Sequence, residues 1–226
     1  MKKRYERNLN ALSIEENARL KKFKVCVAGC GGLGGYIIEH LGRLGVGSIT
    51  AVDGDVFDES NLNRQLLSDE NAIGKSKAER AKIRMKQVNS DVEILDINEY
   101  ITEKNCEKIL RGHDVILDAL DNITSRLLIE KEARKLSIPL IHGAIAGWYG
   151  QMCVILPGDP LFEKIYPEGV ERGIEQESGN LPFTAAVIAS IQAAEAVKVL
   201  LGKNNFLKSK LLTMDLLNND YEIFEI

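Results

Sequence analysis

A glycine-rich loop between a predicted strand and a predicted helix constrains the fold of this chain more than any other feature. The loop, Gly29-Cys30-Gly31-Gly32-Leu33-Gly34, follows a strand-like stretch at 24–28 and opens a helix predicted at 34–44. A second strand, predicted at 48–52, ends at Asp53. An acid about 20 residues after such a loop lies beside the ribose in strand–helix–strand units whose glycines approach a phosphate. The sequence therefore predicts a Rossmann-like α/β fold with a nucleotide site.

Strands and helices go on alternating along the chain, which favours a doubly wound, mostly parallel sheet. Further strands are predicted at 92–95, 114–119, 140–142 and 151–156, and further helices at 77–89, 102–111, 125–136 and 183–201. Residues 157–182 hold four of the five prolines and are predicted to form a long irregular crossover. Two closing strands, at 210–216 and 221–225, are expected to make an antiparallel edge. Because no break in composition marks a second unit, residues 1–226 are predicted to form a single domain.

The composition argues against nucleic-acid binding and membrane insertion. The net charge is −4 and the isoelectric point about 5.6, and basic residues gather only at the N-terminus, in Lys2, Lys3, Arg4 and Arg7. No apolar run approaches the roughly 20 residues that a spanning helix needs, and the N-terminus is charged rather than apolar. We therefore expect a cytoplasmic protein and expect neither a membrane nor a nucleic-acid partner.

Two cations downstream of Asp53 distinguish the chain from a dehydrogenase. Hydride transfer leaves the phosphates of the cofactor untouched and needs no charge neutralisation there. Phosphoryl and adenylyl transfer do need it, because negative charge approaches and leaves a phosphorus atom that is already surrounded by negative oxygens. Arg64 and Lys77 therefore indicate a nucleotide whose phosphates are attacked.

The combined pattern resembles the ubiquitin-activating-like adenylating enzymes of the ThiF/MoeB/HesA family, over nearly the whole chain. The matching segments are the glycine loop, Asp53-Gly54-Asp55, Asn61-Leu62-Asn63-Arg64-Gln65, Gly74-Lys75-Ser76-Lys77, Leu117-Asp118-Ala119-Leu120-Asp121-Asn122, residues 143–150, and Gln192-Ala193-Ala194-Glu195-Ala196. The N-terminal run Arg4-Tyr5-Glu6-Arg7-Asn8 is similar to the opening of family members. In the family, the second arginine of that opening enters the active site of the partner subunit.

The resemblance implies an enzyme that uses ATP to adenylate the C-terminal glycine of a ubiquitin-like protein, with release of pyrophosphate. Arg64 and Lys77 of one subunit and Arg7 of the other would screen the phosphates, which implies a homodimer. Asp121 would hold Mg²⁺, which prefers oxygen ligands. Asp53 would bind the ribose. The residues expected to contact the nucleotide are Gly29, Gly31, Gly32, Gly34, Asp53, Asn61, Arg64, Lys77, Asp121 and Asn122.

Each of these assignments has a simpler alternative. Arg64 could be a surface arginine, and Lys75 rather than Lys77 could be the phosphate ligand. Asp121 and the asparagine after it could cap the helix predicted at 125–136. Arg7 could belong to a frayed terminus. Asp55, which could be a turn residue, is left out of the core site.

Departures from the family pattern limit the chemistry that the resemblance implies. Zinc-binding members carry two C-x-x-C pairs and this chain has none, so zinc is not expected. Several members also carry a reactive cysteine in the crossover, whereas residues 173–182 contain no cysteine. Cys153 and His142 are expected to be structural residues on strands. The enzyme is therefore expected to stop at the adenylate and to pass it to sulfur or an amine held elsewhere.

The leading hypothesis is an adenylyltransferase that activates a sulfur-carrier protein of the ThiS or MoaD type. A family cousin resembling the enzyme that dehydrates threonylcarbamoyl-adenosine in tRNA is the alternative within the family. An NAD-linked oxidoreductase is the alternative from another class, and it rests on the glycine loop and Asp53 alone. Neither the carrier protein nor the acceptor of the adenylate can be read from the residues.

Overall fold

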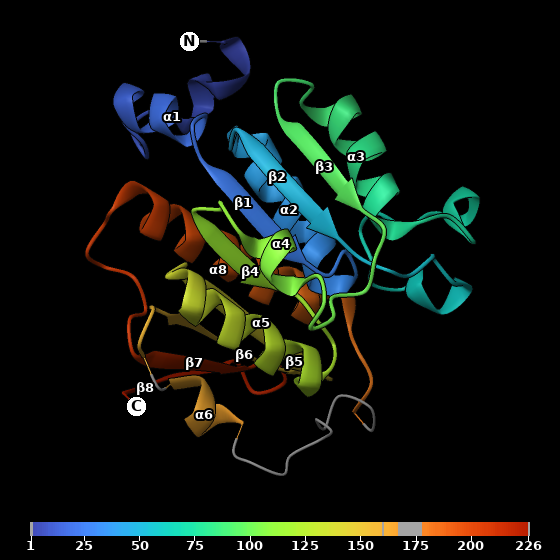
Figure 1. Ribbon diagram of the computed structural model, residues 1–226, viewed down its shortest axis with the longest axis vertical. Coiled ribbons are helices and arrows are strands. Elements are labelled where there is room, and N and C mark those ends of the chain that lie inside the picture. The colour runs from blue at the N-terminus through green and yellow to red at the C-terminus, as the bar shows by residue number, and fades with distance from the viewer. Residues whose placement is uncertain (1, 160, 167–177, 226) are drawn as a thin grey trace.

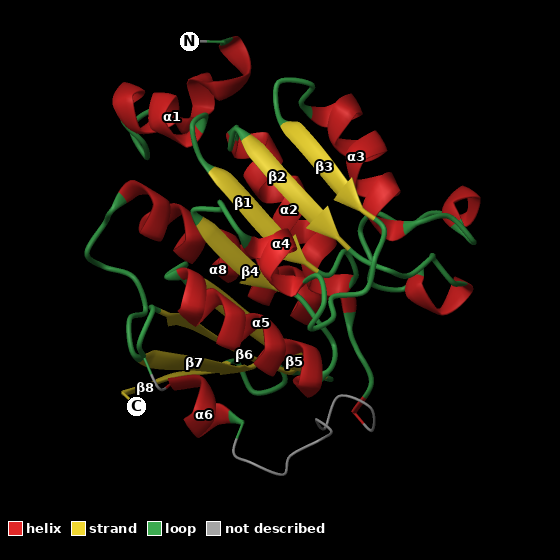
Figure 2. Cartoon of the chain, viewed as in Figure 1, coloured by secondary structure: helices red, strands yellow, loops and turns green. Residues whose placement is uncertain are grey.

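All strands in the described part of the chain belong to one mixed sheet. The computed structural model describes residues 2–159, 161–166 and 178–225. The sheet has eight strands in the order β3-β2-β1-β4-β5-β6-β7-β8 (Figure 2). The strands are β1 (Lys24–Ala28), β2 (Ser48–Val52), β3 (Glu93–Ile97), β4 (Val115–Asp118), β5 (Leu140–Ala146), β6 (Tyr149–Ile155), β7 (Lys210–Asp215) and β8 (Asp220–Glu225).

Helices cover both faces of the sheet (Figure 1). One face carries α2, α3 and α8, whose apolar side chains form the larger buried cluster with the sheet. The other face carries α4, α5 and α6 over a second cluster. The helices are α1 (Ile14–Leu20), α2 (Gly32–Leu44), α3 (Lys77–Val88), α4 (Cys106–Leu110), α5 (Ile123–Leu136), α6 (Leu161–Ile165) and α8 (Pro182–Leu201), with 3-10 turns η1 (Lys3–Asn8), η2 (Glu59–Asn61) and η3 (Glu70–Ala72).

Strand order places the carboxyl ends of β1, β2 and β4 next to one another. The five strands β3, β2, β1, β4 and β5 run parallel, with Ala28 opposite Val52 on one side and Asp118 on the other. The chain moves outward from β1 in one direction through β2 and β3, and in the other through β4 and β5. Ligands of doubly wound folds bind at such a switch point. The predicted α/β fold with an antiparallel edge is thus confirmed, and the antiparallel part begins at β6.

Helix boundaries follow from capping residues in the sequence. Gly45 ends α2 in the left-handed region at φ +92°, and its N–H donates to the carbonyls of Leu41 and Gly42. Ser76 begins α3 by accepting a hydrogen bond from the Glu79 N–H. Such caps satisfy backbone groups that the helix itself leaves unpaired.

Two elements differ most from their predicted lengths, one because of a local turn and the other because of strand pairing. The helix predicted at 102–111 is reduced to α4, because the Asn105 Oδ1 accepts the Thr102 N–H at 2.7 Å and holds the preceding residues in a turn. The strand predicted at 140–142 extends to Ala146, because it pairs with antiparallel β6 beyond the point where β4 ends. Gly143 is required in that extension, since a Cβ there would lie 2.4 Å from Cδ of Gln192.

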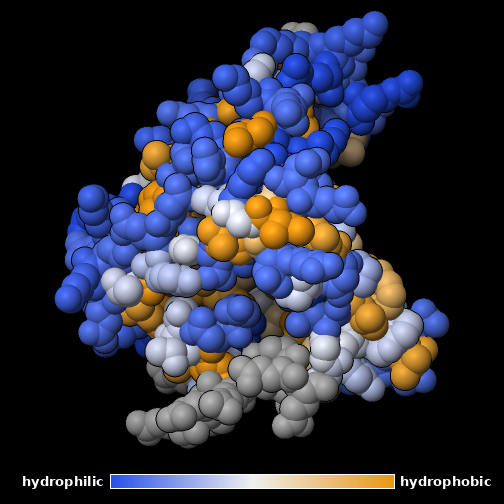
Figure 3. Space-filling model, turned by 90° about the vertical axis from the view of Figure 1, so that its right-hand side faces the viewer, coloured by the Kyte–Doolittle hydropathy of each residue, from blue (hydrophilic) through white to orange (hydrophobic). Residues whose placement is uncertain are grey.

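The expectation that no apolar run reaches spanning length was wrong for α8. This helix has 20 residues and is long and apolar enough to cross a membrane, but it is a core helix that packs against α2 and the sheet. Gln192 and Glu195 are buried along it. Figure 3 shows that the face to the right of Figure 1 is mainly hydrophilic. The apolar character of α8 is therefore explained by the core.

The region predicted to be an irregular crossover, 157–182, contains the short helix α6. Residues 167–177 of that crossover lie outside the described residues. The long helix predicted at 183–201 is confirmed and begins one residue earlier, with Pro182 in its first turn.

Candidate active site

A cavity of about 210 Å³ opens at the carboxyl ends of the central parallel strands. Its walls come from the glycine loop after β1, the segment after β2, the segment after β3 and the turn between β4 and α5. The sequence-predicted residues that line it are Gly29, Gly31, Gly32, Asp53, Arg64, Lys77, Asp121 and Asn122. Residues that lie 93 positions apart in the sequence thus meet on one cavity wall.

The glycine loop is packed too closely for side chains at two of its positions. Gly29 has φ +97°, and a Cβ there would lie 2.5 Å from the carbonyl oxygen of Ala119. A Cβ on Gly34 would lie 1.8 Å from the Gly29 carbonyl oxygen. The loop therefore needs glycine so that its backbone can turn directly into α2 beside the β4 turn. Its N–H groups gather at the N-terminus of that helix, where anions bind favourably.

Asp53 joins the glycine loop to the end of β2. Its two carboxylate oxygens accept the N–H of Cys30 at 2.7 Å and the N–H of Asp55 at 2.8 Å. Burial raises the pKa of Asp53, against the opposing effect of these hydrogen bonds. The side chain is half-buried and lines the cavity, so it combines a structural role in the loop with access to a ligand.

Lys77 lies in the first turn of α3 and is paired with Asp55. The Lys77 Nζ is 3.2 Å from the Asp55 Oδ2, and the Lys77 side chain is only 9% exposed. The other oxygen of Asp55 accepts a hydrogen bond from the Tyr100 hydroxyl. Partial burial opposes ionisation, but the hydroxyl and the ammonium lower the pKa of Asp55. Lys75 is exposed and lies outside the cavity lining, which favours Lys77 as the cation of this site.

Arg64 reaches the cavity from the segment after β2. Its Nη1 donates to the Ser60 carbonyl at 3.0 Å and to the Asn63 Oδ1 at 2.8 Å. No carboxylate among the described residues forms an ion pair with it. A half-buried guanidinium that is held by neutral acceptors keeps its charge available for an anion.

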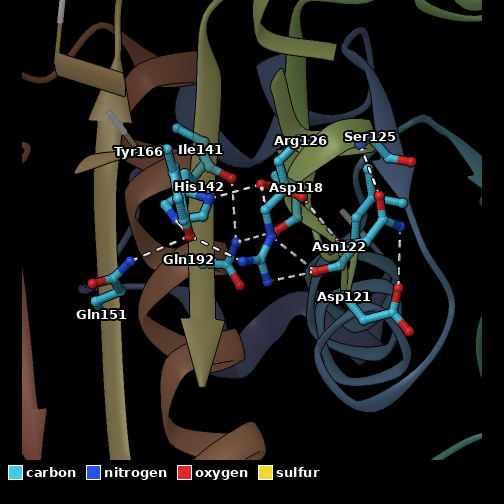
Figure 4. A network of polar contacts seen from close by, with 11 residues as sticks. Asp118, Asp121, Asn122, Ser125, Arg126, Ile141, His142, Gln151, Tyr166 and Gln192 are labelled. Atoms are coloured by element: carbon cyan, nitrogen blue, oxygen red, sulfur yellow. Dashed lines mark hydrogen bonds and ion pairs between the residues drawn. The ribbon is translucent and has the colours of Figure 1, made fainter. Parts of the chain in front are cut away.

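Asp121 and Asn122 have separate positions at the start of α5 (Figure 4). Asn122 is the N-cap, since its Oδ1 accepts the Ser125 N–H at 2.8 Å. Asp121 is exposed, lines the cavity and is not the cap. The capping alternative therefore applies to Asn122 and leaves the Asp121 carboxylate available.

Comparison with known proteins agrees with this arrangement. The model of the ThiF family matches residues 5–226. This chain belongs to the ThiF family. The match covers every residue of the cavity lining.

Relatives of this ThiF-family chain carry names of activating enzymes or adenylyltransferases. The "SAMP-activating enzyme E1" of Haloferax volcanii is 34% identical, and the match covers 97% of this chain and 83% of that protein. The "Sulfur carrier protein adenylyltransferase" of Thermus thermophilus is 35% identical, over 96% of this chain and 84% of that protein. The "Molybdopterin-synthase adenylyltransferase" of Haemophilus influenzae is 32% identical, over 94% and 89%. Among solved structures, an E. coli MccB complex with MccA-N7isoASN superposes with a TM-score of 0.87 at 22% identity, over 99% of this chain and 71% of that one, which supports the fold.

Three sequence-predicted residues of the ThiF-family chain lie outside the cavity lining. Gly34 is buried inside α2 and serves the packing of the loop. The Asn61 side chain accepts the Asp58 N–H at 3.1 Å and so stabilises η2, the turn whose Asn61 carbonyl accepts the Arg64 N–H. Arg7 is exposed on η1, away from the cavity of its own chain.

Several lining residues were missed by sequence reasoning. Gln65 is buried against Gly31 and its Oε1 has no hydrogen-bond partner among the described residues. Tyr100 comes from the segment after β3 and packs on Gly54, where a Cβ would lie 2.6 Å from the Tyr100 Cγ. Arg126, in the first turn of α5, is 4% exposed. Gln65 lies inside a recognised motif and could have been found, whereas Tyr100 and Arg126 reach the site only through the fold.

The four cysteines and His142 are all buried, which fits the structural roles expected of Cys153 and His142. All four cysteines are buried, and burial raises the pKa of Cys26 to about 12 and that of Cys106 to about 11. Burial also raises the pKa of Cys153, on β6, far above its usual range. Thiols in such surroundings stay protonated and are poor nucleophiles. Burial lowers the pKa of His142, although its hydrogen bond to Asp118 opposes this.

Across the described ranges, no group of three or more acidic, histidine or cysteine side chains could hold a metal ion by itself.

Proposed function

We propose that this chain adenylates the C-terminal glycine of a ubiquitin-like sulfur-carrier protein, using ATP and releasing pyrophosphate. The observation that carries the proposal is the meeting of Arg64, Lys77 and Asp121 with a glycine loop on the walls of one cavity. The named activities of the Haloferax, Thermus and Haemophilus relatives support the choice of substrate class.

The reaction explains why the cavity needs cations. An oxygen of the glycine carboxylate forms a bond to the α-phosphorus, the bond from that phosphorus to the bridging oxygen breaks, and pyrophosphate leaves with the electron pair. Negative charge therefore moves from the carboxylate toward the departing phosphates. Arg64 and Lys77 stabilise the charge that develops on the phosphate oxygens, in a site where they are already positioned.

The Lys77 ammonium has three N–H donors, so it can bind a phosphate oxygen as well as, or instead of, Asp55. The ammonium is paired with Asp55 at 3.2 Å. A bound polyphosphate carries more charge than a single carboxylate, and the exposed Asp55 can remain hydrogen-bonded to Tyr100. The Asp55–Tyr100 pair thus holds the lysine ready at the cavity wall.

Mg²⁺ would bind through the Asp121 carboxylate together with phosphate oxygens and water. The fit is chemical: an exposed carboxylate on the cavity wall is a hard oxygen donor, and Mg²⁺ uses one or two such groups with substrate phosphates. When bound, the ion would neutralise phosphate charge. Zinc forms no part of the proposal, since the chain carries no C-x-x-C pair.

The proposed active form is a homodimer in the cytoplasm. Arg7 lies on the exposed η1 turn and is outside the cavity of its own chain, so it could serve only the cavity of a second copy. The acceptor of the adenylate is proposed to lie on another protein, because the crossover sequence supplies no cysteine and the four thiols present are buried.

The alternatives account for fewer of these residues. Hydride transfer by an NAD-linked enzyme gives no role to Arg64 and Lys77. A tRNA-directed family cousin would use the same phosphate site, but the acidic balance of the chain and the shortness of its basic N-terminal stretch argue against it.

The first test is ATP–pyrophosphate exchange with a panel of carrier proteins ending in Gly-Gly, run on the wild-type protein and on Arg7→Ala. Exchange that depends on one carrier and collapses in Arg7→Ala supports both the adenylation and the shared dimer site. Exchange that survives Arg7→Ala keeps the chemistry and removes the dimer claim. If no carrier supports exchange, the proposed substrate is wrong, and tight, salt-sensitive retention of bulk tRNA on a filter would favour the RNA-directed cousin.

A further inference from the structure

A buried chain of hydrogen bonds joins α6 to the turn that carries Asp121 (Figure 4). Tyr166, the residue directly after α6, has its hydroxyl 3.1 Å from the Nε2 of His142 and 2.9 Å from the Nη1 of Arg126. His142 lies fully buried on β5, and its Nδ1 is 2.7 Å from the Oδ2 of Asp118 at the end of β4. Four segments of the chain therefore meet at one hydroxyl group and its partners.

The chemistry of the partners fixes the direction of each hydrogen bond. The Asp118 carboxylate only accepts, so the neutral imidazole of His142 donates from Nδ1 and accepts at Nε2. The Tyr166 hydroxyl then donates its single proton to Nε2. Its oxygen accepts from the Arg126 Nη1, and from the Gln151 Nε2 at 3.4 Å. The Tyr166 hydroxyl thus bonds both the histidine and the arginine, and Asp118 contacts the same two residues from the other side, through the His142 Nδ1 and an ion pair with the Arg126 Nε at 3.9 Å.

Arg126 transmits this arrangement to the cavity wall. Its Nε and Nη2 both donate to the carbonyl of Leu120, at 3.2 and 2.7 Å. The N–H of Leu120 donates to the Oδ1 of Asp118 at 3.0 Å. The peptide groups on both sides of Leu120 are therefore held by side chains of the network, and Asp121 is the next residue.

The ring of Tyr166 packs against other aromatic rings, and these contacts do not involve its hydroxyl. The Tyr166 ring lies 5.0 Å from that of Phe162 and 5.5 Å from that of His142, centroid to centroid. Phe162 is fully buried and secures α6 against the sheet. Removal of the hydroxyl alone would keep these contacts, while it leaves a donor of the buried Arg126 without a partner.

We propose that Tyr166 is a positioning residue, which holds Arg126 against Leu120 and so fixes the turn that presents Asp121 to the cavity. The docking of α6 and the geometry of the proposed phosphate and metal site are then linked through a single hydroxyl. The role assigned to Asp121 rests on the proposed function, whereas the link between Tyr166 and the turn does not.

The test compares Tyr166→Phe with Tyr221→Phe by hydrogen–deuterium exchange of the protein without ligand. Tyr221 is exposed on β8, so its variant makes the same chemical change far from the network. We expect amide exchange at Leu120 to be about fivefold faster in Tyr166→Phe, the factor that corresponds to one hydrogen bond of ~1 kcal/mol, and unchanged in Tyr221→Phe. Unchanged exchange at Leu120 in a folded Tyr166→Phe protein would overturn the proposal.

A second variant tests whether the effect passes through Arg126. Arg126→Lys removes the fork that binds Leu120, and it should accelerate the same amide. If Tyr166 acts through Arg126, the double variant should exchange no faster than Arg126→Lys alone. Additive effects would mean that the Tyr166 hydroxyl supports the turn by a route other than Arg126, and the proposal would be wrong. If Tyr166→Phe proves poorly folded, Arg126→Lys alone still tests the proposal. Unchanged amide exchange at Leu120 in a folded Arg126→Lys protein would overturn it, because the proposed route from Tyr166 to the turn passes through Arg126.

A functional readout separates this inference from the proposed reaction. In pyrophosphate exchange, Tyr166→Phe should raise the Mg²⁺ concentration that gives the half-maximal rate by about fivefold. This factor equals the expected acceleration of amide exchange at Leu120. Faster hydrogen–deuterium exchange at Leu120 in Tyr166→Phe, together with no pyrophosphate exchange by the wild-type protein, would support the positioning role and reject the proposed function. Normal Mg²⁺ dependence together with fast exchange at Leu120 would reject the effect on Asp121.

Discussion

Lys77 and Asp55 form an ion pair on the cavity wall, with Nζ 3.2 Å from Oδ2, although 22 residues separate them in the sequence. The same two residues are also joined through their backbones, since the Lys77 N–H donates to the Asp55 carbonyl at 3.1 Å. The start of α3 is thereby attached to the end of the β2 segment. A helix residue that would otherwise be a flexible surface lysine becomes a positioned cation.

Lys77→Gln should abolish most adenylation, whereas Lys75→Gln should not. Loss of one preorganised charge at a phosphate costs about 10²–10³ in rate. Lys75 is the matched control, because it is a lysine two residues away that is exposed and outside the cavity. Pyrophosphate exchange at saturating ATP and carrier measures both. Equal losses in the two variants would mean that the nearby charge, rather than the position of Lys77, matters.

Asp121→Asn and Asn122→Ala should separate activity from stability. Asn122 caps α5 through the Ser125 N–H, so Asn122→Ala should lower the free energy of unfolding by about 1 kcal/mol. Asp121 makes no cap, so Asp121→Asn should leave the urea midpoint near that of the wild type while exchange activity falls by about 10² or more. An active Asp121→Asn protein would remove this residue from the proposed metal site.

Gly34→Ala and Gly32→Ala should fail in different ways. A Cβ on Gly34 would lie 1.8 Å from the Gly29 carbonyl oxygen, so this variant should lose folded protein or displace the loop. A Cβ on Gly32 meets nothing closer than 3.8 Å within the chain, yet Gly32 lines the cavity. Gly32→Ala should therefore fold with an unchanged melting temperature and bind ATP more weakly, as measured by calorimetry. Unaltered ATP affinity in Gly32→Ala would show that the nucleotide does not approach this part of the loop.

The strands beside the glycine loop could be predicted because local signals and the fold agree there. β1 and β2 match their predicted ranges, since short apolar runs end at glycine or at an acid. The length of β5 could not be predicted, because its second half contains glycine and alanine and depends on pairing with β6. Long-range pairing overrides a weak local pattern at such positions.

In the candidate site, too, some residues could be predicted from local motifs and others depend on the fold. The glycines, Asp53, Arg64 and Asp121 lie in motifs that can be read from the sequence. Tyr100 enters the cavity because β3 is the parallel neighbour of β2, and this relation is a property of the sheet order. No local pattern marks such a residue, so the site was predicted without the hydroxyl that holds Asp55.

His142 supplies a prediction about pH. Burial lowers its pKa below the ordinary value of 6.5 despite the bond to Asp118, so the folded protein holds the imidazole neutral in a pH range where the unfolded chain protonates it. The unfolded state then binds more protons, and the free energy of unfolding must fall as the pH drops below about 6.5, by at most about 1.4 kcal/mol per pH unit from this residue. Urea unfolding between pH 7.5 and 5.5 should show this decline.

Carbon and nitrogen NMR of labelled histidine identifies the group responsible. The chain has three histidines, and His40→Gln and His113→Gln variants assign the remaining signal to His142. That signal should titrate below the ordinary value of 6.5 and, in its neutral form, show the tautomer with the proton on Nδ1, because the Asp118 oxygen 2.7 Å away can only accept. In Tyr166→Phe the Nε2 loses its donor at 3.1 Å, so the Nε2 shift should move toward that of a free nitrogen while Nδ1 is unchanged. An imidazole that titrates at or above pH 6.5, or that carries its proton on Nε2, would contradict both the buried pair and the direction of the hydrogen bonds from Tyr166.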